Sequence, residues 1–160
     1  MRIILGNDHG GCDVKQQLIA RATELGHTAE NVGTDTEEIV RYPYFAAEVC
    51  RAVAGGQADR GILICSTGIG MSMIANKFRG IRAALCTDTY MAKMTRRHND
   101  ANVLCLGGKI TGIYEMLDIV ETWLATPYDG GRHDISLGLV AEAEAAMITG
   151  RPWQPTGPRR

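Results

Sequence analysis

The sequence has almost no net charge and no long apolar run, and its first residues are not expected to form a secretory leader. Its 17 Lys and Arg residues nearly balance 18 Asp and Glu residues, and the formal net charge is -1. That balance excludes the strong basic field that draws proteins to nucleic acid. The longest apolar runs are far too short to span a bilayer. We therefore expect neither nucleic-acid nor membrane partners, and a cytoplasmic location.

Cysteine pairs are also lacking. The chain has five cysteines, an odd number without any CxxC spacing, at Cys12, Cys50, Cys65, Cys86 and Cys105. This pattern argues against a disulfide framework or a zinc knuckle, so we expect reduced thiols. Three of the five lie in apolar patterns typical of small buried residues, and only Cys65 occupies a chemically suggestive position.

What is present is an ordinary globular composition. The 160 residues are 45% hydrophobic and 22% charged, which fits one domain with an adequate core. We expect a single domain over residues 1–150. Residues 151–160 hold three of the five prolines and are predicted to form a loose tail.

Short β-branched runs alternate with longer amphipathic stretches, a pattern typical of βαβ units. The expected strands are Arg2–Leu5, Thr28–Val32, Gly61–Ile64, Ile81–Cys86 and Val103–Leu106. The expected helices are Cys12–Leu25, Tyr44–Ala54, Gly70–Lys77, Met91–Arg97, Ile113–Ala125 and Ser136–Ile148. Together they predict an α/β fold, a three-layer α/β/α sandwich with a five-stranded, parallel, Rossmann-like sheet.

Parallel sheets bind ligands beyond the carboxyl ends of their strands, so the residues that follow each strand matter most. These segments are unusually polar and glycine-rich. They gather a carboxylate, an imidazole, a thiol, hydroxyls and glycines on one predicted rim, in residues 6–11, 65–70, 87–90 and 107–109.

Cys65 ends an apolar strand and is followed at once by the loop Ser66-Thr-Gly-Ile-Gly70 and a helix. Unpaired N–H groups at such a junction can hold an anion and favour a thiolate. The loop lacks the lysine of GxxxxGK[ST] and is too short for GxGxxG, which disfavours a nucleotide site. The pattern predicts a thiolate base beside an oxyanion or small-phosphate cradle, and a purely structural turn is the alternative.

Three further groups each allow two interpretations. Asp8 and His9 either cap the following helix or contact a ligand. The basic end of the 91–97 helix either complements its dipole or delivers His98 as a general acid with Asn99 as an orienting amide. Arg132, expected in a loop, offers a fork-shaped donor for phosphate. His9, His98 and His133 could converge on a metal, but no HExxH-type spacing supports that, and no metal is predicted.

In combination these residues resemble the type-B ribose-5-phosphate isomerase family, whose relatives also act on galactose 6-phosphate and allose 6-phosphate. The resemblance covers nearly the whole chain. Its motifs are Asn7-Asp-His-Gly10, Tyr42-Pro43, Gly61-Ile-Leu-Ile-Cys-Ser-Thr-Gly-Ile-Gly70 running on through Ala75-Asn-Lys77, Gly80-Ile-Arg-Ala83, His98-Asn-Asp-Ala-Asn-Val103 and Gly130-Gly-Arg-His133.

The resemblance implies an aldose–ketose isomerase of the pentose phosphate pathway that needs no metal and no cofactor. It implies that Cys65 moves a proton between C1 and C2 through an enediolate, with His98 opening the furanose ring. The implied catalytic residues are Cys65, His98 and Thr67. The implied substrate-binding residues are Asp8, His9, Tyr42, Ser66, Gly68, Ile69, Gly70, Asn99 and Arg132, with His9 and Arg132 on the phosphate.

The resemblance also implies a homodimer or a dimer of dimers with shared active sites. Some site residues would come from the second subunit, and the C-terminal helix would be exchanged or packed at the dimer interface.

Three positions depart from the family pattern. Ser136 replaces a second phosphate-binding arginine, Arg41 replaces the usual Asp before Tyr42, and Ser66 replaces a glycine. A missing bidentate contact weakens the expected hold on a terminal phosphate. The leading interpretation is interconversion of ribose 5-phosphate and ribulose 5-phosphate. The alternatives are another aldose, such as a hexose 6-phosphate, a tetrose phosphate or a free sugar, or a binding module without catalysis.

Overall fold

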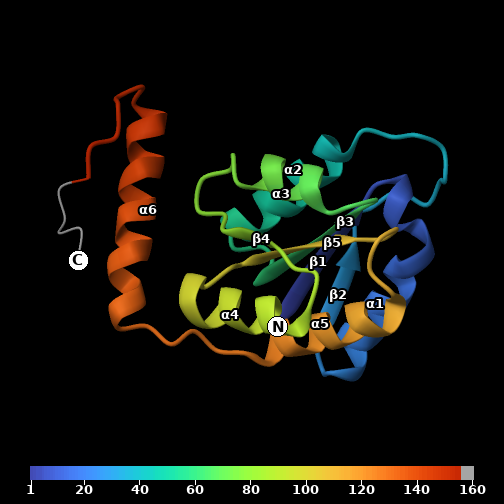
Figure 1. Cartoon of the computed structure of the whole chain (residues 1–160). Coiled ribbons are helices and arrows are strands. Elements are labelled where there is room, and N and C mark those ends of the chain that lie inside the picture. Colours follow the sequence, from blue (N-terminus) through green and yellow to red (C-terminus); the bar gives the residue numbers. More distant parts are fainter. Residues whose placement is uncertain (156–160) are drawn as a thin grey trace.

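Five strands form one parallel sheet in the computed structural model, which describes residues 1–155 (Figure 1). Their order across the sheet is β2-β1-β3-β5-β4. The strands are β1 (Arg2–Asn7), β2 (Thr28–Asn31), β3 (Arg60–Cys65), β4 (Ala83–Leu85) and β5 (Val103–Gly107). The central position of β3 places the residue that ends it, Cys65, in the middle of one edge of the sheet.

Two helical layers cover the sheet. The helices are α1 (Cys12–Glu24), α2 (Tyr42–Ala54), α3 (Ile69–Ala75), α4 (Thr89–Asn99), α5 (Ile113–Ala125) and α6 (Arg132–Ile148), with a short 3-10 turn, η1 (His9–Gly11). One core cluster packs α1, α4 and α5 on one face, and a second packs α2 and α3 on the other. The expected α/β/α sandwich with five parallel strands is confirmed.

Strand β3 shows why both faces of the sheet are covered. Its side chains alternate: Ile62 and Ile64 belong to the core cluster with α1 and α5, while Leu63 and Cys65 belong to the cluster with α2 and α3. A continuous apolar run is what a parallel strand buried on both faces requires. Cys65 therefore faces the α2 and α3 layer.

The fourth strand is shorter than expected. The sequence predicts a strand over Ile81–Cys86, whereas β4 covers only Ala83–Leu85. Two asparagine side chains take over the backbone partners at its start: Asn76 Oδ1 accepts from the Ala83 N–H at 3.0 Å, and Asn102 Oδ1 accepts from the Arg82 N–H at 2.8 Å. An edge strand has one unpaired side, so such side-chain bonds can replace its ladder.

Helix α4 is longer than expected at both ends. It begins two residues early because Asp88 Oδ1 accepts a hydrogen bond from the Met91 N–H at 2.8 Å, which caps the helix. It ends at Asn99, and Asp100 follows in the left-handed conformation with φ 44°. These two aspartates set the length of the helix.

The expectation that Arg132 lies in a loop is wrong, because Arg132 is the first residue of α6. Gly130 and Gly131 have φ values of 64° and 63°, so two left-handed residues end the connecting loop and the helix begins at once. Figure 1 shows α6 beside α4 and apart from the two helical layers. None of its residues is buried.

Residues 151–155 follow α6 without helix or strand, and residues 156–160 of the expected tail lie outside the described residues. Within residues 1–155 no helix combines the length and the apolar character that crossing a membrane requires.

Candidate functional site

The chain reverses its direction of growth across the sheet between β1 and β3. Strand β2 lies on one side of β1, and the chain then crosses to β3 on the other side. In parallel sheets ligands bind at such a switch point, outside the carboxyl ends of the two strands. Here those ends lead into Asp8 and His9 on one side of the crevice and into Cys65 on the other. The predicted rim thus coincides with the switch point.

Three loops meet at this rim. A Cβ atom added to Gly10 would lie 2.5 Å from the backbone nitrogen of Ser66, and one added to Gly108 would lie 2.3 Å from the Gly10 carbonyl oxygen. The Gly108 N–H donates to the Cys65 carbonyl at 2.8 Å, and the Asp8 N–H donates to the Ile64 carbonyl at 3.1 Å. Glycine is required at both positions because no side chain fits between the loops.

Cys65 lies at the boundary between the core and the rim, with 6% of its surface exposed. Its Sγ accepts a hydrogen bond from the Gly68 N–H at 3.1 Å. Among the described cysteines, only this sulfur accepts a hydrogen bond from a backbone N–H. By contrast, burial raises the pKa of the Cys50 and Cys86 thiols to about 12 each, and raises that of Cys105 as well. Those three thiols stay protonated at neutral pH.

The loop after Cys65 is held in one shape by its surroundings. Gly68 has φ 75°, and an added Cβ would lie 2.5 Å from the Leu85 side chain and 2.9 Å from the Leu106 carbonyl carbon. The Thr67 hydroxyl accepts from the Ile69 N–H at 3.3 Å. Ser66 and Thr67 are half-buried and Ile69 is exposed. The close contacts at Gly68 give this turn a structural role. The same turn places the hydroxyl groups of Ser66 and Thr67 at the rim.

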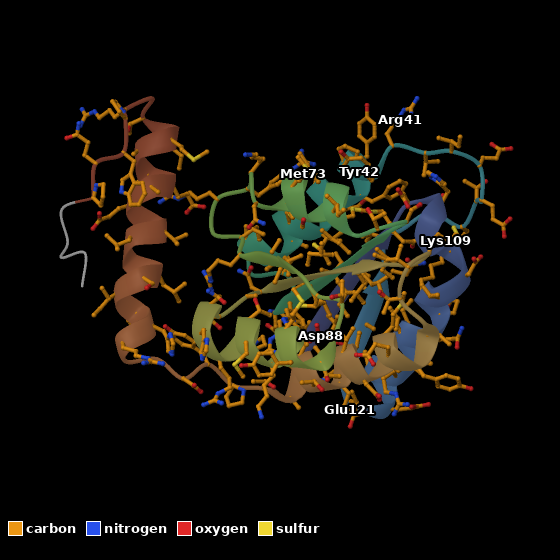
Figure 2. All side chains as sticks on the ribbon, viewed as in Figure 1. Arg41, Tyr42, Met73, Asp88, Lys109 and Glu121 are labelled. Atoms are coloured by element: carbon orange, nitrogen blue, oxygen red, sulfur yellow. The ribbon has the colours of Figure 1, made fainter. Side chains whose placement is uncertain are left out.

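Tyr42 packs over the start of α3. A Cβ atom on Gly70 would lie 2.9 Å from the Tyr42 ring, so the ring lies directly against the backbone there. Figure 2 shows Tyr42 and Met73 on the side of the molecule formed by α2 and α3. The placement makes Tyr42 part of the wall beside the Cys65 loop.

Asp8 performs the capping role that the sequence left open. It is 4% exposed, and its Oδ1 accepts from the Gly10 N–H at 2.8 Å at the start of η1. The half-buried neighbour, His9, accepts at Nδ1 from the Val40 N–H at 3.3 Å. In a neutral imidazole the proton then sits on Nε2, which becomes a donor. Capping and ligand contact are compatible, because each group keeps a further polar atom.

The segment 33–41 runs past this rim and is fastened by residues that the sequence analysis did not single out. Lys15 is only 3% exposed; its Nζ donates to the Thr34 carbonyl at 2.5 Å and to the Asp35 carboxylate. Cys12 Sγ donates to the Thr36 carbonyl at 3.1 Å. The signal was available, because Lys15 shares the inward face of α1 with Leu18 at helical spacing.

Lys109 belongs to the rim segment 107–109, and its backbone N–H donates to the Ser66 carbonyl at 3.0 Å. It follows the rim residues Gly107 and Gly108, and its Nζ is paired with the Asp13 carboxylate of α1 (Figure 2). The ammonium group thereby ties the loop after β5 to the first helix.

The remaining candidate residues lie near the amino ends of the strands, at the opposite end from the Cys65 rim. His98 and Asn99 end α4, which leads through three residues into the start of β5, whereas Cys65 pairs with Gly107 at the far end of β5. The length of β5 separates these two ends by about 13 Å. Arg132 begins α6 on the same side as His98. His98 and Asn99 therefore do not face the Cys65 rim of their own chain.

These distant residues form a cluster of their own. The imidazole rings of His98 and His133 stack with centroids 4.3 Å apart and an angle of 15° between their planes. Asp129 lies beside them and is held by Arg97, whose Nε and Nη2 each donate to its carboxylate at 2.8 Å. The hydrogen bond from Arg97 lowers the pKa of Asp129. A carboxylate and two imidazoles thus share one position beside the start of α6.

The predicted site residues fall into two groups. The rim brings together Asp8, His9, Tyr42, Cys65, Ser66, Thr67, Gly68, Ile69 and Gly70. The second group lies near the amino ends of the strands and consists of His98, Asn99 and Arg132. The predicted set is therefore not brought together within one chain.

The chain is similar to known proteins over most of its length. Residues 3–139 match the family described as Ribose/Galactose Isomerase. Ribose-5-phosphate isomerase B of Escherichia coli is 46% identical over 132 residues, which cover 82% of this chain and 89% of the relative. D-erythrulose-4-phosphate isomerase of Pectobacterium atrosepticum is 38% identical over 132 residues, which cover 82% and 87%.

A solved structure of Clostridium thermocellum ribose-5-phosphate isomerase B superimposes with a TM-score of 0.90 at 46% identity, and the match covers 92% of this chain and 99% of that one. The family match spans most of the chain, and both the sheet and the helices correspond to those of the solved enzyme. The chain therefore belongs to the ribose/galactose isomerase family.

Proposed function

We propose that this protein is an aldose–ketose isomerase that interconverts ribose 5-phosphate and ribulose 5-phosphate with Cys65 as the base. The observation that carries the proposal is the position of Cys65, at the carboxyl end of the central strand, with the Gly68 N–H aimed at its sulfur. The family match and the E. coli relative, named for this activity, support the same reaction.

In the reaction, the Cys65 thiolate removes the proton from C2 of the open-chain aldose. The electron pair of that C–H bond forms a C1–C2 double bond, and the carbonyl electrons move to O1, giving an enediolate. The thiol then returns the proton to C1, the proton of the C2 hydroxyl passes to O1, and C2 becomes the carbonyl carbon, which leaves the ketose. Atoms and charge balance without a cofactor.

The charge that develops on the sugar oxygens needs donors. The backbone N–H groups of residues 66–70 and the Thr67 hydroxyl would supply them. Within this loop the Gly68 N–H is bonded to the sulfur and the Ile69 N–H to the Thr67 hydroxyl, and close contacts at Gly68 hold the loop in place. Preorganised donors of this kind contribute about 3–4 kcal/mol when one is removed from other enzymes. Proton transfer by a positioned group contributes about 10²–10⁴-fold in rate.

Binding of the sugar is divided between the two groups of residues. Asp8 and Asn99 would engage hydroxyls, and His9 would hold the phosphate through Nε2, because Nδ1 is already bonded to Val40. His98 would open the furanose ring, and Arg132 would add a charged fork for the phosphate. His98, Asn99 and Arg132 would reach the Cys65 rim from a second copy.

A homodimer with shared sites is supported by the surface of the chain. Helix α6 buries none of its residues, and Ile135, Val140 and Met147 on it are more than half exposed. A groove of about 520 Å³ runs between α6 and the β4 side of the body, lined by Ile81, Ala83, Ala84, Leu137, Val140 and Met147 among others. Tyr44, Met73 and Tyr90 add further exposed apolar area. Apolar surface of this extent is typical of an interface.

The serine at position 136 favours an alternative sugar substrate. Ser136 stands one turn after Arg132 in α6, so the arginine that would complete a two-fork phosphate clamp is absent. A relative at 38% identity is named for a four-carbon sugar phosphate. Another aldose, phosphorylated or free, is therefore the alternative within the same reaction class.

Turnover of ribose 5-phosphate by Cys65→Ala tests the assignment of the base. The variant should lose activity by at least 10³-fold while its circular dichroism spectrum stays unchanged, because no other described thiol accepts a backbone N–H at its sulfur. Cys12→Ala is the matched control: Cys12 is half-buried, and burial raises the pKa of its thiol. Near-normal turnover in Cys65→Ala would refute the proposal.

A panel of sugars separates the two substrates. Catalytic efficiency should be highest for ribose 5-phosphate if His9 and one arginine suffice for phosphate binding. Higher efficiency with a tetrose phosphate, a hexose phosphate or a free sugar would assign the alternative. Binding of every sugar without turnover would instead identify a binding module.

A further inference from the structure

The cluster of His98, Asp129 and His133 has the composition of a transition-metal site. One ligand atom from each residue lies within 4.8 Å of the other two. A tetrahedral ion held at about 2.1 Å by each ligand places ligand atoms about 3.4 Å apart, so shifts of about 1.4 Å or less complete the site. We propose that these three residues bind a divalent ion of the Zn²⁺, Co²⁺ or Ni²⁺ class.

The donor set decides which ions fit. Two imidazole nitrogens and one carboxylate suit zinc and its neighbours in the transition series, whereas Mg²⁺ and Ca²⁺ prefer sites made of oxygen. Three protein ligands leave one coordination position open, as in zinc sites that keep a water molecule. The ion would therefore remain accessible to small anions.

The geometry requires one local rearrangement. The two rings are stacked 15° from parallel, and a nitrogen lone pair lies in the plane of its ring, so the rings must tilt apart to point at one ion. The torsion that turns a histidine ring is broad and soft. Both histidines are half-buried and the carboxylate is exposed, which leaves room for this movement.

The two helix ends beside the cluster have opposite effects on a bound cation. His98 lies in the last turn of α4, where the carbonyl end of the helix favours a cation, while His133 lies in the first turn of α6, where the amide end disfavours one. The two helix-end effects have opposite signs, so they offset each other at the cluster. Arg97 competes with the ion for Asp129 but also fixes the position of that carboxylate.

This metal site has no part in the isomerisation proposed above, which uses no metal. Because His98 is also assigned to ring opening, an ion at the cluster would remove that imidazole from the reaction and act as an inhibitor. This consequence rests on the proposed function, whereas metal binding itself does not.

Titration of Co²⁺ into the tag-free, EDTA-treated protein tests the proposal. We expect one Co²⁺ per chain, with d–d absorption typical of nitrogen and oxygen ligands and without the intense sulfur-to-cobalt band of a thiolate site. Zn²⁺ should displace the Co²⁺. In His133→Gln the affinity should fall at least tenfold, and in Asp129→Asn it should fall less.

His27→Gln is the matched control, because His27 lies at the other end of the chain beside the N-terminal amine and is not part of the cluster. Circular dichroism of the metal-free variants checks that they fold. Unchanged Co²⁺ affinity in folded His133→Gln, or a thiolate band that disappears in Cys12→Ala, would overturn the proposal.

Turnover measured with and without Zn²⁺ separates this proposal from the proposed function. Inhibition that EDTA reverses, and that is absent in His133→Gln at the same Zn²⁺ concentration, supports both. Zn²⁺ bound at the cluster with undiminished turnover would leave the metal site in place and overturn the role of His98 in ring opening.

Discussion

Cys65 differs from the other cysteines in the group that faces its sulfur. Burial is the main cause that raises the pKa of the other buried thiols, which are those of Cys50, Cys86 and Cys105. Cys65 is nearly as buried but receives the Gly68 N–H, because strand β3 ends there and the chain turns sharply. One hydrogen bond to sulfur thus separates a candidate base from three structural thiols.

Close backbone packing makes Gly10 a sensitive position. In Gly10→Ala the added methyl would lie 2.5 Å from the Ser66 nitrogen and would push the loop after β3 away from its place. We expect a loss of stability of about 1–3 kcal/mol and a fall in kcat/KM of at least tenfold. Denaturant unfolding and steady-state kinetics measure the two effects.

Gly112→Ala is the control for that change, since an added methyl there meets nothing within 4 Å and φ is -64°. Its stability and its kcat/KM should remain close to those of the parent. Equal effects in the two variants would show that the contact between the loops after β1 and β3 does not matter.

At the scale of secondary structure, Asp100 joins α4 to β5. It takes φ 44°, and its carboxylate pairs with Arg96 and Arg82, each at 2.8 Å. Because Arg96 is only 5% exposed, removal of the carboxylate leaves a buried guanidinium without its ion pair. The short connection that follows His98 and Asn99 depends on this one residue.

We therefore expect Asp100→Ala to cost about 2–4 kcal/mol, from the left-handed backbone and the unpaired arginine together. Asp100→Asn should cost less, since asparagine tolerates this conformation. Asp118→Ala, at an exposed position of α5, should change stability by less than about 0.5 kcal/mol. Urea unfolding compares the three, and an identical midpoint for Asp100→Ala and Asp118→Ala would contradict the account.

Most elements could be predicted from hydrophobic spacing, because a parallel sheet with two covers demands buried strands and amphipathic helices. The ends of β4 and α4 could not, since they depend on Asn76, Asn102 and Asp88, whose side chains replace backbone partners. Such bonds between distant residues leave no periodic trace. The start of α6 at Arg132 was hidden by two glycines that looked like a continuing loop.

The candidate site shows the same division. The rim residues follow their strands in the sequence, so their meeting at one edge could be predicted. The placement of His98, Asn99 and Arg132 at the other edge follows from the antiparallel run of α4 against the sheet, which local motifs do not reveal. The spacing of Lys15 in α1 predicts that it faces inward. The sequence does not predict which groups of segment 33–41 accept its hydrogen bonds.

At the scale of the whole molecule, a shared site makes a quantitative prediction. Cys65→Ala and His98→Gln should each be inactive alone. If subunits of the two variants are mixed, dissociated and reassociated at random, half of the dimers hold one of each, and each of these has one intact site. About a quarter of the parent activity should return. No recovery, with mixed dimers shown by mass spectrometry, would contradict the sharing of sites.

Alkaline pH should destabilise the fold as a whole. Folding raises the pKa of the Cys50 and Cys86 thiols from 9.0 to about 12, so above pH 9 the unfolded chain binds fewer protons than the folded one. Stability is complete below pH 9 and falls as pH rises toward 12, by about 1 kcal/mol per pH unit for each thiol. Urea midpoints at pH 8 and pH 10 measure this, and the slope should diminish in Cys50→Val. An equal midpoint at both pH values would contradict it.

The most direct test of the central claim is deuterium incorporation into the sugar in D₂O, followed by NMR at C2 of ribose 5-phosphate and C1 of ribulose 5-phosphate. The parent protein should introduce solvent deuterium at these carbons, because a single thiol accepts the proton and exchanges it before return. Cys65→Ser should introduce none above the uncatalysed background. Incorporation at the parental rate in Cys65→Ser would show that another group moves the proton and would contradict the account.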